Sequence, residues 1–245
     1  MVFRIQHVIK LLYRPVLFFF LVPLLYIATG LIFSLQYNHF DALSFGFLYL
    51  FILLNQMLEN VLLRIPTSDF EVSKRFIVSL EVLNAALLLY FGWQHSWIAA
   101  LVLLLYSVII QVQFIFSYYH LDELAAFMAA FLKVFLLNAF AFYTHTHFIH
   151  PRYLPVYLGL FLPFFLFEVT RTEWQPKSKW LITVSILIFL IGILLLWSAL
   201  RWQSLFLLLA LPFAFLFRFE FSRKTTAIFA FSFSLVFNLL VFISI

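Results

Sequence analysis

The sequence predicts an all-α protein, a polytopic membrane bundle of nine transmembrane helices. Of its 245 residues, 66% are hydrophobic and only 10% are charged, which is far more apolar surface than a water-soluble domain needs. Apolar runs of about 17–23 residues recur along the chain, and a helix of that length crosses the hydrocarbon core of a bilayer. Basic residues are concentrated in alternate loops. We therefore expect a single transmembrane domain over residues 1–245.

The apolar runs are separated by polar residues and, at several breaks, by proline or glycine, which end or interrupt helices. We expect the helices near residues 15–35, 42–63, 76–93, 97–118, 125–149, 153–169, 180–199, 202–217 and 225–245. The breaks contain Pro66, Gly92, Pro151, Pro155 and Pro176. The sixth and eighth runs are the shortest, so we expect these helices to be tilted or held in the membrane by their neighbours.

Most lysines and arginines lie in loops on one side of the predicted bundle. That side carries Arg4, Lys10, Arg14, Arg64, Lys74, Arg75, Arg171, Lys177, Lys179, Arg218, Arg223 and Lys224. The opposite side carries Arg152 and Arg201, while Lys133 lies in or at the start of a helix. Because basic loops remain in the cytoplasm, this asymmetry places the N-terminus inside and the C-terminus outside. We expect a multi-pass protein of the bacterial inner (cytoplasmic) membrane.

The formal net charge of +5 is explained by basic loops that face anionic membrane lipid. We therefore expect a lipid environment and no nucleic-acid partner. The chain contains no cysteine, which excludes disulfide and thiolate chemistry.

The first of two polar stretches lies at the predicted cytoplasmic end of the second helix. Asn55 and Glu59 are four residues apart and share one helical face, with Gln56 and Asn60 beside them and Arg64 continuing the stripe. Such side chains are costly in lipid, so they must face the bundle interior or a wet cavity. One interpretation is a pocket for a divalent cation and a phosphorylated ligand, because Mg²⁺ takes carboxylate and amide oxygens together with phosphates. The other is interhelical hydrogen bonding, which Asn and Gln commonly provide in membranes.

The second polar stretch follows the sixth helix. Glu168 and Glu173 are five residues apart, so they share a helical face less well than a pair four apart. Arg171, with Lys177 and Lys179 nearby, supplies cations that can hold a diphosphate. The same residues also fit a cytoplasmic loop that obeys the positive-inside rule and contains a local ion pair.

These stretches resemble the motifs of the UbiA-type intramembrane polyprenyltransferases, and the resemblance spans most of the chain. Tyr13-Arg14-Pro15 is similar to the family's Arg-Pro opening, and Asn55-Gln56-Met57-Leu58-Glu59 matches the first half of its Asp-rich motif in register. Val72-Ser73-Lys74-Arg75, followed by Val78-Ser79-Leu80, resembles the basic loop that leads into the third helix. Phe167-Glu168-Val169-Thr170-Arg171 resembles a variant of the second motif. Nine helices with the N-terminus inside and the C-terminus outside are also the family arrangement.

The resemblance implies a transferase that moves a polyprenyl group from an isoprenoid diphosphate to a hydrophobic acceptor, with Mg²⁺ as cofactor. In the family, the two motifs bind Mg²⁺ and the diphosphate, and the prenyl tail lies in a central cavity that opens to lipid. The resemblance implies Glu59 and Glu168 as catalytic residues. It implies Asn55, Glu59, Glu168 and Glu173 as metal ligands, and Arg64, Lys74, Arg171, Asp122 and Lys133 as substrate-binding residues.

Three positions depart from the family pattern. Gln56 replaces an Asp, Leu63 stands where the last Asp of the first motif belongs, and Thr172 stands where the second motif has a basic residue or a carboxylate. A diphosphate site with two Mg²⁺ normally has several carboxylates to neutralise the metals. The departures favour a second hypothesis, a catalytically inactive relative that binds a lipid or isoprenoid and serves as a partner subunit of another membrane system.

The segment after the fourth helix leaves alternatives open for its charged residues. Asp122 or Glu123 either positions an acceptor or stabilises the N-terminus of the fifth helix. If that helix starts at Leu124, Lys133 lies about 15 Å deep by the helical rise and should pair with an acid or a phosphate. If residues 121–132 instead form a surface helix, Lys133 is interfacial and extends its charge to water.

Two sets of polar residues lie away from these stretches. The histidines His145, His147 and His150 invite a metal hypothesis, but the first two are two residues apart, which does not fit a helix face, and no carboxylate lies near them in the sequence. Asn138 and Asn238 are interpreted as helix-packing residues rather than ligands.

Overall fold

The computed structural model describes residues 15–64, 73–119, 121–161, 164–165 and 223–243, together with a few residues between 190 and 205. All regular structure in these residues is helical, and none of them lies in a strand. The all-α prediction is therefore confirmed for the part of the chain that the structure describes.

The first half of the described chain consists of long helices. They are α2 (Pro15–Ser34), α3 (Ala42–Arg64), α4 (Lys74–Gln94) and α5 (Trp97–Tyr118). Their bounds agree with the first four predicted helices to within two residues. The agreement follows from composition, because each helix is a predominantly apolar segment bounded by polar or proline-containing breaks.

The fifth predicted helix forms without a break, although its middle turn is wound differently. Its parts are α6 (Asp122–Phe131), the π-helical turn η1 (Leu132–Leu136) and α7 (Leu137–Thr146). The start of the sixth predicted helix contains η2 (Pro151–Tyr153) and α8 (Leu154–Gly159), and the last predicted helix is α12 (Arg223–Ile243). Most of the seventh and eighth predicted helices lies outside the described residues.

Three of the described helical segments are long and apolar enough to cross a membrane. These are Ala42–Leu62, Lys74–Gln94 and Leu124–Thr146. Shorter apolar helices cover Phe19–Ser34, Trp97–Gln113 and Phe231–Ile243. The finding agrees with an integral membrane protein, whereas the count of nine helices and the UbiA-like arrangement stay predictions.

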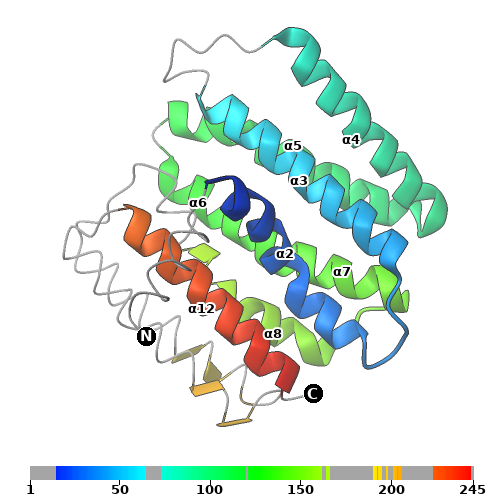
Figure 1. Ribbon diagram of the computed structural model, residues 1–245, viewed down its shortest axis with the longest axis vertical. Coiled ribbons are helices and arrows are strands. Elements are labelled where there is room, and N and C mark those ends of the chain that lie inside the picture. The colour runs from blue at the N-terminus through cyan, green and yellow to red at the C-terminus, as the bar shows by residue number, and fades with distance from the viewer. Residues whose placement is uncertain are drawn as a thin grey trace.

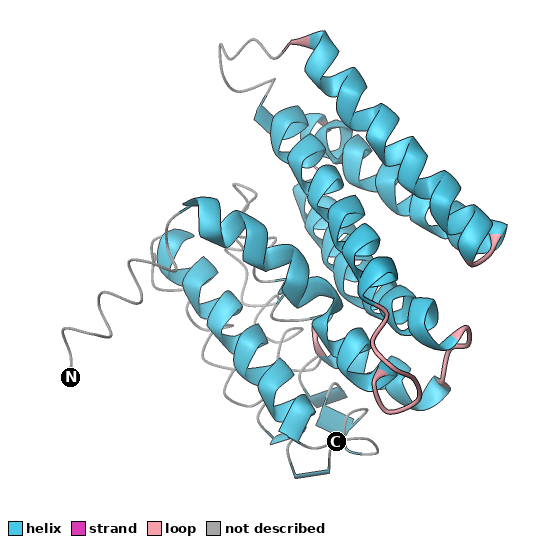
Figure 2. Ribbon diagram, turned by 45° about the vertical axis from the view of Figure 1, so that its right-hand side comes forward, coloured by secondary structure: helices cyan, strands magenta, loops and turns pink. Residues whose placement is uncertain are grey.

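The helices form one bundle in which α2 packs against both α7 and α12, while α3 packs against α4, α5 and α7. α4 and α12 lie on opposite sides of the described bundle (Figures 1 and 2). Phe47 contacts Tyr90 and Asn55 bonds Asn84, so α3 and α4 run antiparallel. The end of the bundle that contains Arg64 and Lys74 is called here the predicted cytoplasmic end.

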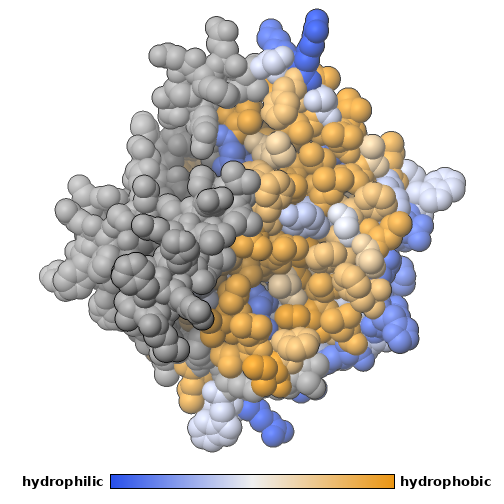
Figure 3. Space-filling model, viewed as in Figure 1, coloured by the Kyte–Doolittle hydropathy of each residue, from blue (hydrophilic) through white to orange (hydrophobic). Residues whose placement is uncertain are grey.

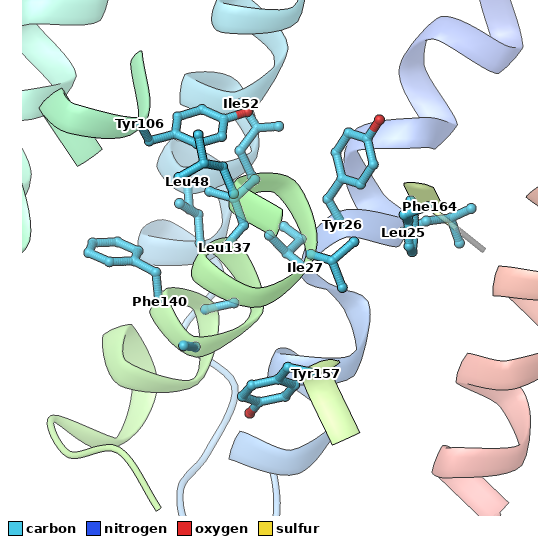
Figure 4. Packing of buried hydrophobic residues seen from close by; sticks show 14 of the residues in the cluster. Leu25, Tyr26, Ile27, Leu48, Ile52, Tyr106, Leu137, Phe140, Tyr157 and Phe164 are labelled. Atoms are coloured by element: carbon cyan, nitrogen blue, oxygen red, sulfur yellow. The ribbon is translucent and has the colours of Figure 1, made fainter. Parts of the chain in front are cut away.

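The bundle is apolar both inside and outside. Tyr26, Leu48, Ile52 and Leu137 belong to a continuous buried cluster at the centre (Figure 4). Apolar residues also cover most of the described face in Figure 3, while hydrophilic residues lie mainly at its edges. Trp93 at the end of α4 is 86% exposed. Apolar surface on both sides of the helices is expected where lipid rather than water surrounds a bundle.

Polar side chains fix two of the helix contacts inside this apolar bundle. The backbone N–H of Gly30 donates to Oδ1 of Asn138 at 2.8 Å, which joins α2 to α7. The hydroxyl of Thr29 donates to Oδ1 of Asn238, which joins α2 to α12. These bonds confirm the interpretation of Asn138 and Asn238 as helix-packing residues.

The close approach of α2 and α7 at Gly30 predicts that one added methyl group will have a strong effect. A Cβ added at Gly30 would lie 2.0 Å from the backbone carbonyl oxygen of Asn138. Since a backbone carbonyl in a helix cannot move aside, Gly30→Ala should push α2 and α7 apart and cost about 1–3 kcal/mol of unfolding free energy. The measurement is thermal unfolding of the detergent-purified chain.

Gly46→Ala is the matched control, because a Cβ at Gly46 meets nothing within 4 Å. Alanine has the higher helix propensity, so this variant should be unchanged or more stable by up to about 1 kcal/mol. Equal melting temperatures of Gly30→Ala and Gly46→Ala would contradict the close approach of α2 and α7 at Gly30.

Candidate functional site

Five buried polar side chains meet between α3, α4, α5 and η1, and we call this group the polar centre. Its members are Asn55, Glu59, Asn84, Ser107 and Lys133. Each is at most 2% exposed. The sequence places Asn55 and Glu59 on one face of α3 because they are four residues apart. Polar groups at this burial are stable only when they bond to one another, and they do so in two parts.

The first part is an ion pair between α3 and η1. The ammonium of Lys133 donates to both carboxylate oxygens of Glu59, at 2.8 Å to Oε1 and 2.9 Å to Oε2. Lys133 Nζ also lies 5.8 Å from the centre of the Tyr26 ring, so the aromatic face adds to its electrostatic stabilisation. Of the two sequence alternatives for Lys133, the structure bears out the buried lysine that pairs with an acid.

The backbone around Lys133 is unusual. Lys133 is the second residue of η1, a five-residue π-helical turn between two α-helical segments. A π-helical turn places an extra residue in the helix and changes the direction of its side chains, and such turns occur frequently at functional sites. Here the turn coincides with the residue that neutralises Glu59.

The second part is a network of amides and a hydroxyl between α3, α4 and α5. Nδ2 of Asn55 donates to Oδ1 of Asn84 at 3.0 Å, and Nδ2 of Asn84 donates to Oγ of Ser107 at 2.7 Å. The Ser107 hydroxyl donates in turn to Oδ1 of Asn55 at 2.6 Å. The three side chains thus form a closed ring of hydrogen bonds. This ring is the interhelical bonding that the sequence offers as one interpretation of Asn55.

The carboxylate and amide oxygens of the polar centre are ligand types that Mg²⁺ accepts, yet their arrangement does not fit a resident ion. Both oxygens of Glu59 accept from Lys133, and Oδ1 of Asn55 accepts from Ser107. A divalent cation at these oxygens would lie against the Lys133 ammonium, which repels it. Among the described residues, no group of three or more His, Asp or Glu side chains could hold a metal.

The other predicted site residues are described only in part. Lys74 begins α4 and is exposed, while Arg64 ends α3 and Asp122 begins α6, with side chains outside the described set. All three positions lie at the predicted cytoplasmic end, because consecutive helices run antiparallel. The predicted residues Glu168, Arg171 and Glu173 lie outside the described residues. Their roles stay predictions.

Sequence reasoning missed two members of the polar centre, and it also missed the aromatic ring beside Lys133. Asn84 and Ser107 are polar residues in the middle of largely apolar helices, a pattern that indicates interhelical hydrogen bonding and could have revealed them. Tyr26 carries no such signal, because aromatic residues make up 22% of the chain. Its position over Lys133 depends on how α2 packs.

Compared with models of known protein families, with curated proteins and with solved structures, the chain matches none. The UbiA-type resemblance therefore rests on the sequence motifs.

A second group of titratable side chains lies at the opposite end of the bundle. His95 follows α4, and its ring centre lies 5.4 Å from that of His147, which follows α7. Burial of the His95 ring and, to a lesser degree, the neighbouring His147 lower its pKa, while Asp41 opposes the shift. The structure thus brings a carboxylate near these histidines that the sequence did not place there. No metal cluster forms at this end in the described residues.

The lowered pKa of His95 predicts a loss of stability in mild acid. The unfolded chain protonates this histidine near pH ~6.5, whereas the folded chain keeps it neutral to lower pH. Because the unfolded state then binds more protons, the contribution of His95 is complete above pH ~6.5 and decreases as the pH falls toward the folded pKa. Thermal unfolding between pH 7.5 and 5 measures this effect.

His95→Gln should flatten the pH dependence of the melting temperature. His39→Gln, at an exposed histidine in the loop between α2 and α3, is the control and should leave the slope unchanged. An identical slope in His95→Gln and the parent chain would contradict the assignment.

The buried ion pair predicts strong coupling between Glu59 and Lys133. Glu59→Gln or Lys133→Met alone removes one charge of the buried pair and should cost about 3–5 kcal/mol. The double variant removes both charges and should cost much less than the sum. Unfolding of the four proteins in detergent gives the coupling energy.

Lys74→Met is the control for loss of a lysine, because Lys74 is exposed and should change stability by no more than about 0.5 kcal/mol. If the double variant loses as much unfolding free energy as the two single variants together, the charges of Glu59 and Lys133 do not depend on each other.

Proposed function

We propose that the chain is an integral membrane prenyltransferase of the UbiA type, which transfers a polyprenyl group from a diphosphate donor to a hydrophobic acceptor. The observation that supports this proposal is the Glu59–Lys133 pair, in which two side chains that are each 1% exposed carry opposite charges. Ionisable residues inside membrane bundles are costly, and they commonly mark substrate or ion pathways.

The proposed reaction requires little covalent chemistry from the protein. The bond between the first prenyl carbon and the diphosphate oxygen breaks, and the diphosphate leaves with the bonding electrons. The same carbon then forms a bond to a nucleophilic atom of the acceptor, which loses a proton. The principal task of the site is therefore to stabilise the negative charge on the departing diphosphate.

The cations of this chain can perform that task at the predicted cytoplasmic end. Lys133 lies in the polar centre, and Glu59, its partner, is about 7.5 Å from the end of α3 at Arg64 by the helical rise. Lys74 begins the neighbouring helix at the same end. Arg64, Lys74 and Arg171 are proposed to bind phosphate oxygens. Mg²⁺ is proposed as cofactor on the resemblance, with Asn55, Glu59, Glu168 and Glu173 as its ligands; binding at Glu59 would require the Lys133 ammonium to move away from the carboxylate.

A second candidate function is supported by the same ion pair. Because Lys133 already neutralises Glu59, the first polar stretch needs no metal to be stable. Gln56 and Leu63 also stand where the related transferases have aspartates. The second candidate is a catalytically inactive relative that binds an isoprenoid or lipid and acts as a partner subunit of a membrane system.

The two candidates differ in turnover. The purified chain is incubated with Mg²⁺, labelled geranylgeranyl diphosphate and a lipid extract that supplies acceptors. A transferase should move the label into lipid and release diphosphate in equal amounts, and Glu59→Ala should reduce the rate at least about 100-fold, the scale on which loss of electrostatic stabilisation acts.

His39→Gln controls for purification and should keep the parent rate. A rise in melting temperature with the diphosphate, without transfer of label, would support the second candidate instead. If label is not transferred and the melting temperature does not rise, both candidate functions are contradicted.

A further inference from the structure

α4 is the least covered of the three segments that are long enough to cross a membrane. Over its most apolar stretch 28% of the residues are buried, compared with 56% in Ala42–Leu62 and 61% in Leu124–Thr146. α4 lies at one side of the bundle (Figures 1 and 2), and exposed apolar side chains such as Val82 and Leu89 cover its outer face. Lipid explains an apolar outer face. It does not explain the carboxylate of Glu81, which lies in the same helix.

One stripe of α4 runs from a close contact with α5 to this carboxylate. The residues of the stripe follow one another at spacings of four, three and four, so they share one helical face. They are Glu81, Ala85, Leu88 and Gly92. At Gly92 the stripe is closed, since a Cβ added there would lie 2.8 Å from the ring of Trp97 on α5. Toward the predicted cytoplasmic end it opens, because Ala85 is exposed and Glu81 is only partly buried.

The neighbouring helix brings an amide to the level of Glu81. Asn84 on α4 donates to Ser107 on α5, which fixes the register of these antiparallel helices. One turn further toward the predicted cytoplasmic end, α4 carries Glu81 and α5 carries Gln111. Gln111 donates to Oγ of Ser107 at 3.0 Å and is only partly buried, so it extends the hydrogen-bonded ring of the polar centre toward the outside. The α4–α5 face is defined here as Glu81, Ala85, Leu104 and Gln111.

Glu81 has no counter-charge on this face. In the part of the chain that the structure describes, no hydrogen bond or ion pair joins the Glu81 carboxylate to another group. Lys74, the cation at the start of the same helix, is seven residues away, which is about 10 Å along the helix axis. An ionised carboxylate at that depth in a bilayer is costly, and such groups normally pair with a cation.

We propose that the α4–α5 face docks a transmembrane helix of a partner protein, and that this helix carries a lysine or arginine at the depth of Glu81. The basic side chain supplies the charge that Glu81 lacks, and the amide oxygen of Gln111 is a second acceptor at the same level. Ala85 is small, so the backbone of the partner helix can approach α4 closely. The proposal concerns the surface of the bundle, and it holds for a transferase and for a partner subunit alike.

Charge complementarity favours a different protein over a second copy of this chain. If two copies met symmetrically through the α4–α5 face, their Glu81 carboxylates would approach one another and repel. Lys133, which lies inside another membrane-length segment, is 1% exposed and pairs with Glu59. A second copy therefore cannot offer this lysine from its surface.

The test uses the full chain in phosphatidylcholine vesicles, with a synthetic transmembrane peptide as the probe. The peptide consists of leucine and alanine and carries one lysine seven residues from one end, while two matched peptides carry leucine or glutamate there. Because the chain has no cysteine, Gln94→Cys at the exposed end of α4 takes one donor dye, and the peptides carry the acceptor. Energy transfer measures binding, and the lysine peptide should bind at least about tenfold more tightly than the leucine peptide.

Two changes of Glu81 test the role of its charge. Glu81→Gln removes the charge and should abolish the preference for the lysine peptide. Glu81→Lys reverses the charge and should transfer the preference to the glutamate peptide. Because Glu81 has no partner among the described residues, Glu81→Gln should leave the melting temperature of the chain without peptide unchanged.

A pair of alanine substitutions tests where the peptide binds. Ala85→Leu makes the α4–α5 face bulkier without changing its charge, and it should weaken binding of the lysine peptide about tenfold. Ala86→Leu is the matched control, because Ala86 is also exposed but points about 100° away around the helix. This variant should bind the peptide as the parent chain does.

Three results would overturn the proposal. The first is equal affinity of the parent chain for the lysine and leucine peptides, or a preference that survives Glu81→Gln. The second is a lower melting temperature of Glu81→Gln without peptide, which would show that Glu81 has its partner within the chain. The third is energy transfer between donor-labelled and acceptor-labelled copies of the chain that Ala85→Leu abolishes, which would assign the face to a second copy. None of these measurements depends on transfer of a prenyl group.

Discussion

The fold depends on the neutralisation of charge and polarity inside an apolar bundle. A carboxylate and an ammonium that are each 1% exposed stabilise one another, because they lie within hydrogen-bond distance. Their separate desolvation costs exceed what ordinary packing contributes, so the pair constrains how α3 and the η1 turn approach one another. A displacement of either helix by one residue would break the pair.

The remaining buried polar groups extend the same constraint to other helices. The ring formed by Asn55, Asn84 and Ser107 joins α3, α4 and α5, and the Gly30–Asn138 contact joins α2 to α7. Dispersion between apolar side chains is compatible with many arrangements of the helices, because an apolar side chain gains similar contacts from lipid and from protein. Hydrogen bonds and ion pairs are directional, so they are compatible with only a few arrangements. The polar residues therefore select the arrangement, while the apolar residues provide the environment in which these bonds are strong.

The sequence predicts local features well and long-range partners poorly. The bounds of α2 to α5 follow from apolar runs, and the shared face of Asn55 and Glu59 follows from their spacing. The partner of Lys133 stayed open between an acid, a phosphate and water, because it depends on how helices distant in the chain meet. The π-helical turn has no sequence signal, and Asn84 and Ser107 become informative only once α4 and α5 are placed against α3. For Glu168 and Glu173 the prediction lies outside the described residues.

The charge balance also bears on what kind of ligand the site can take. An Asp-rich motif carries an excess of negative charge, so it attracts metal ions in the absence of substrate. In this chain Gln56 and Leu63 are uncharged, and Lys133 pairs with the carboxylate of Glu59. The charges of the described polar centre therefore balance, and it lacks the excess negative charge with which an Asp-rich motif attracts metal ions. This balance follows from the pair alone, and it applies equally to a transferase and to a protein that only binds its lipid.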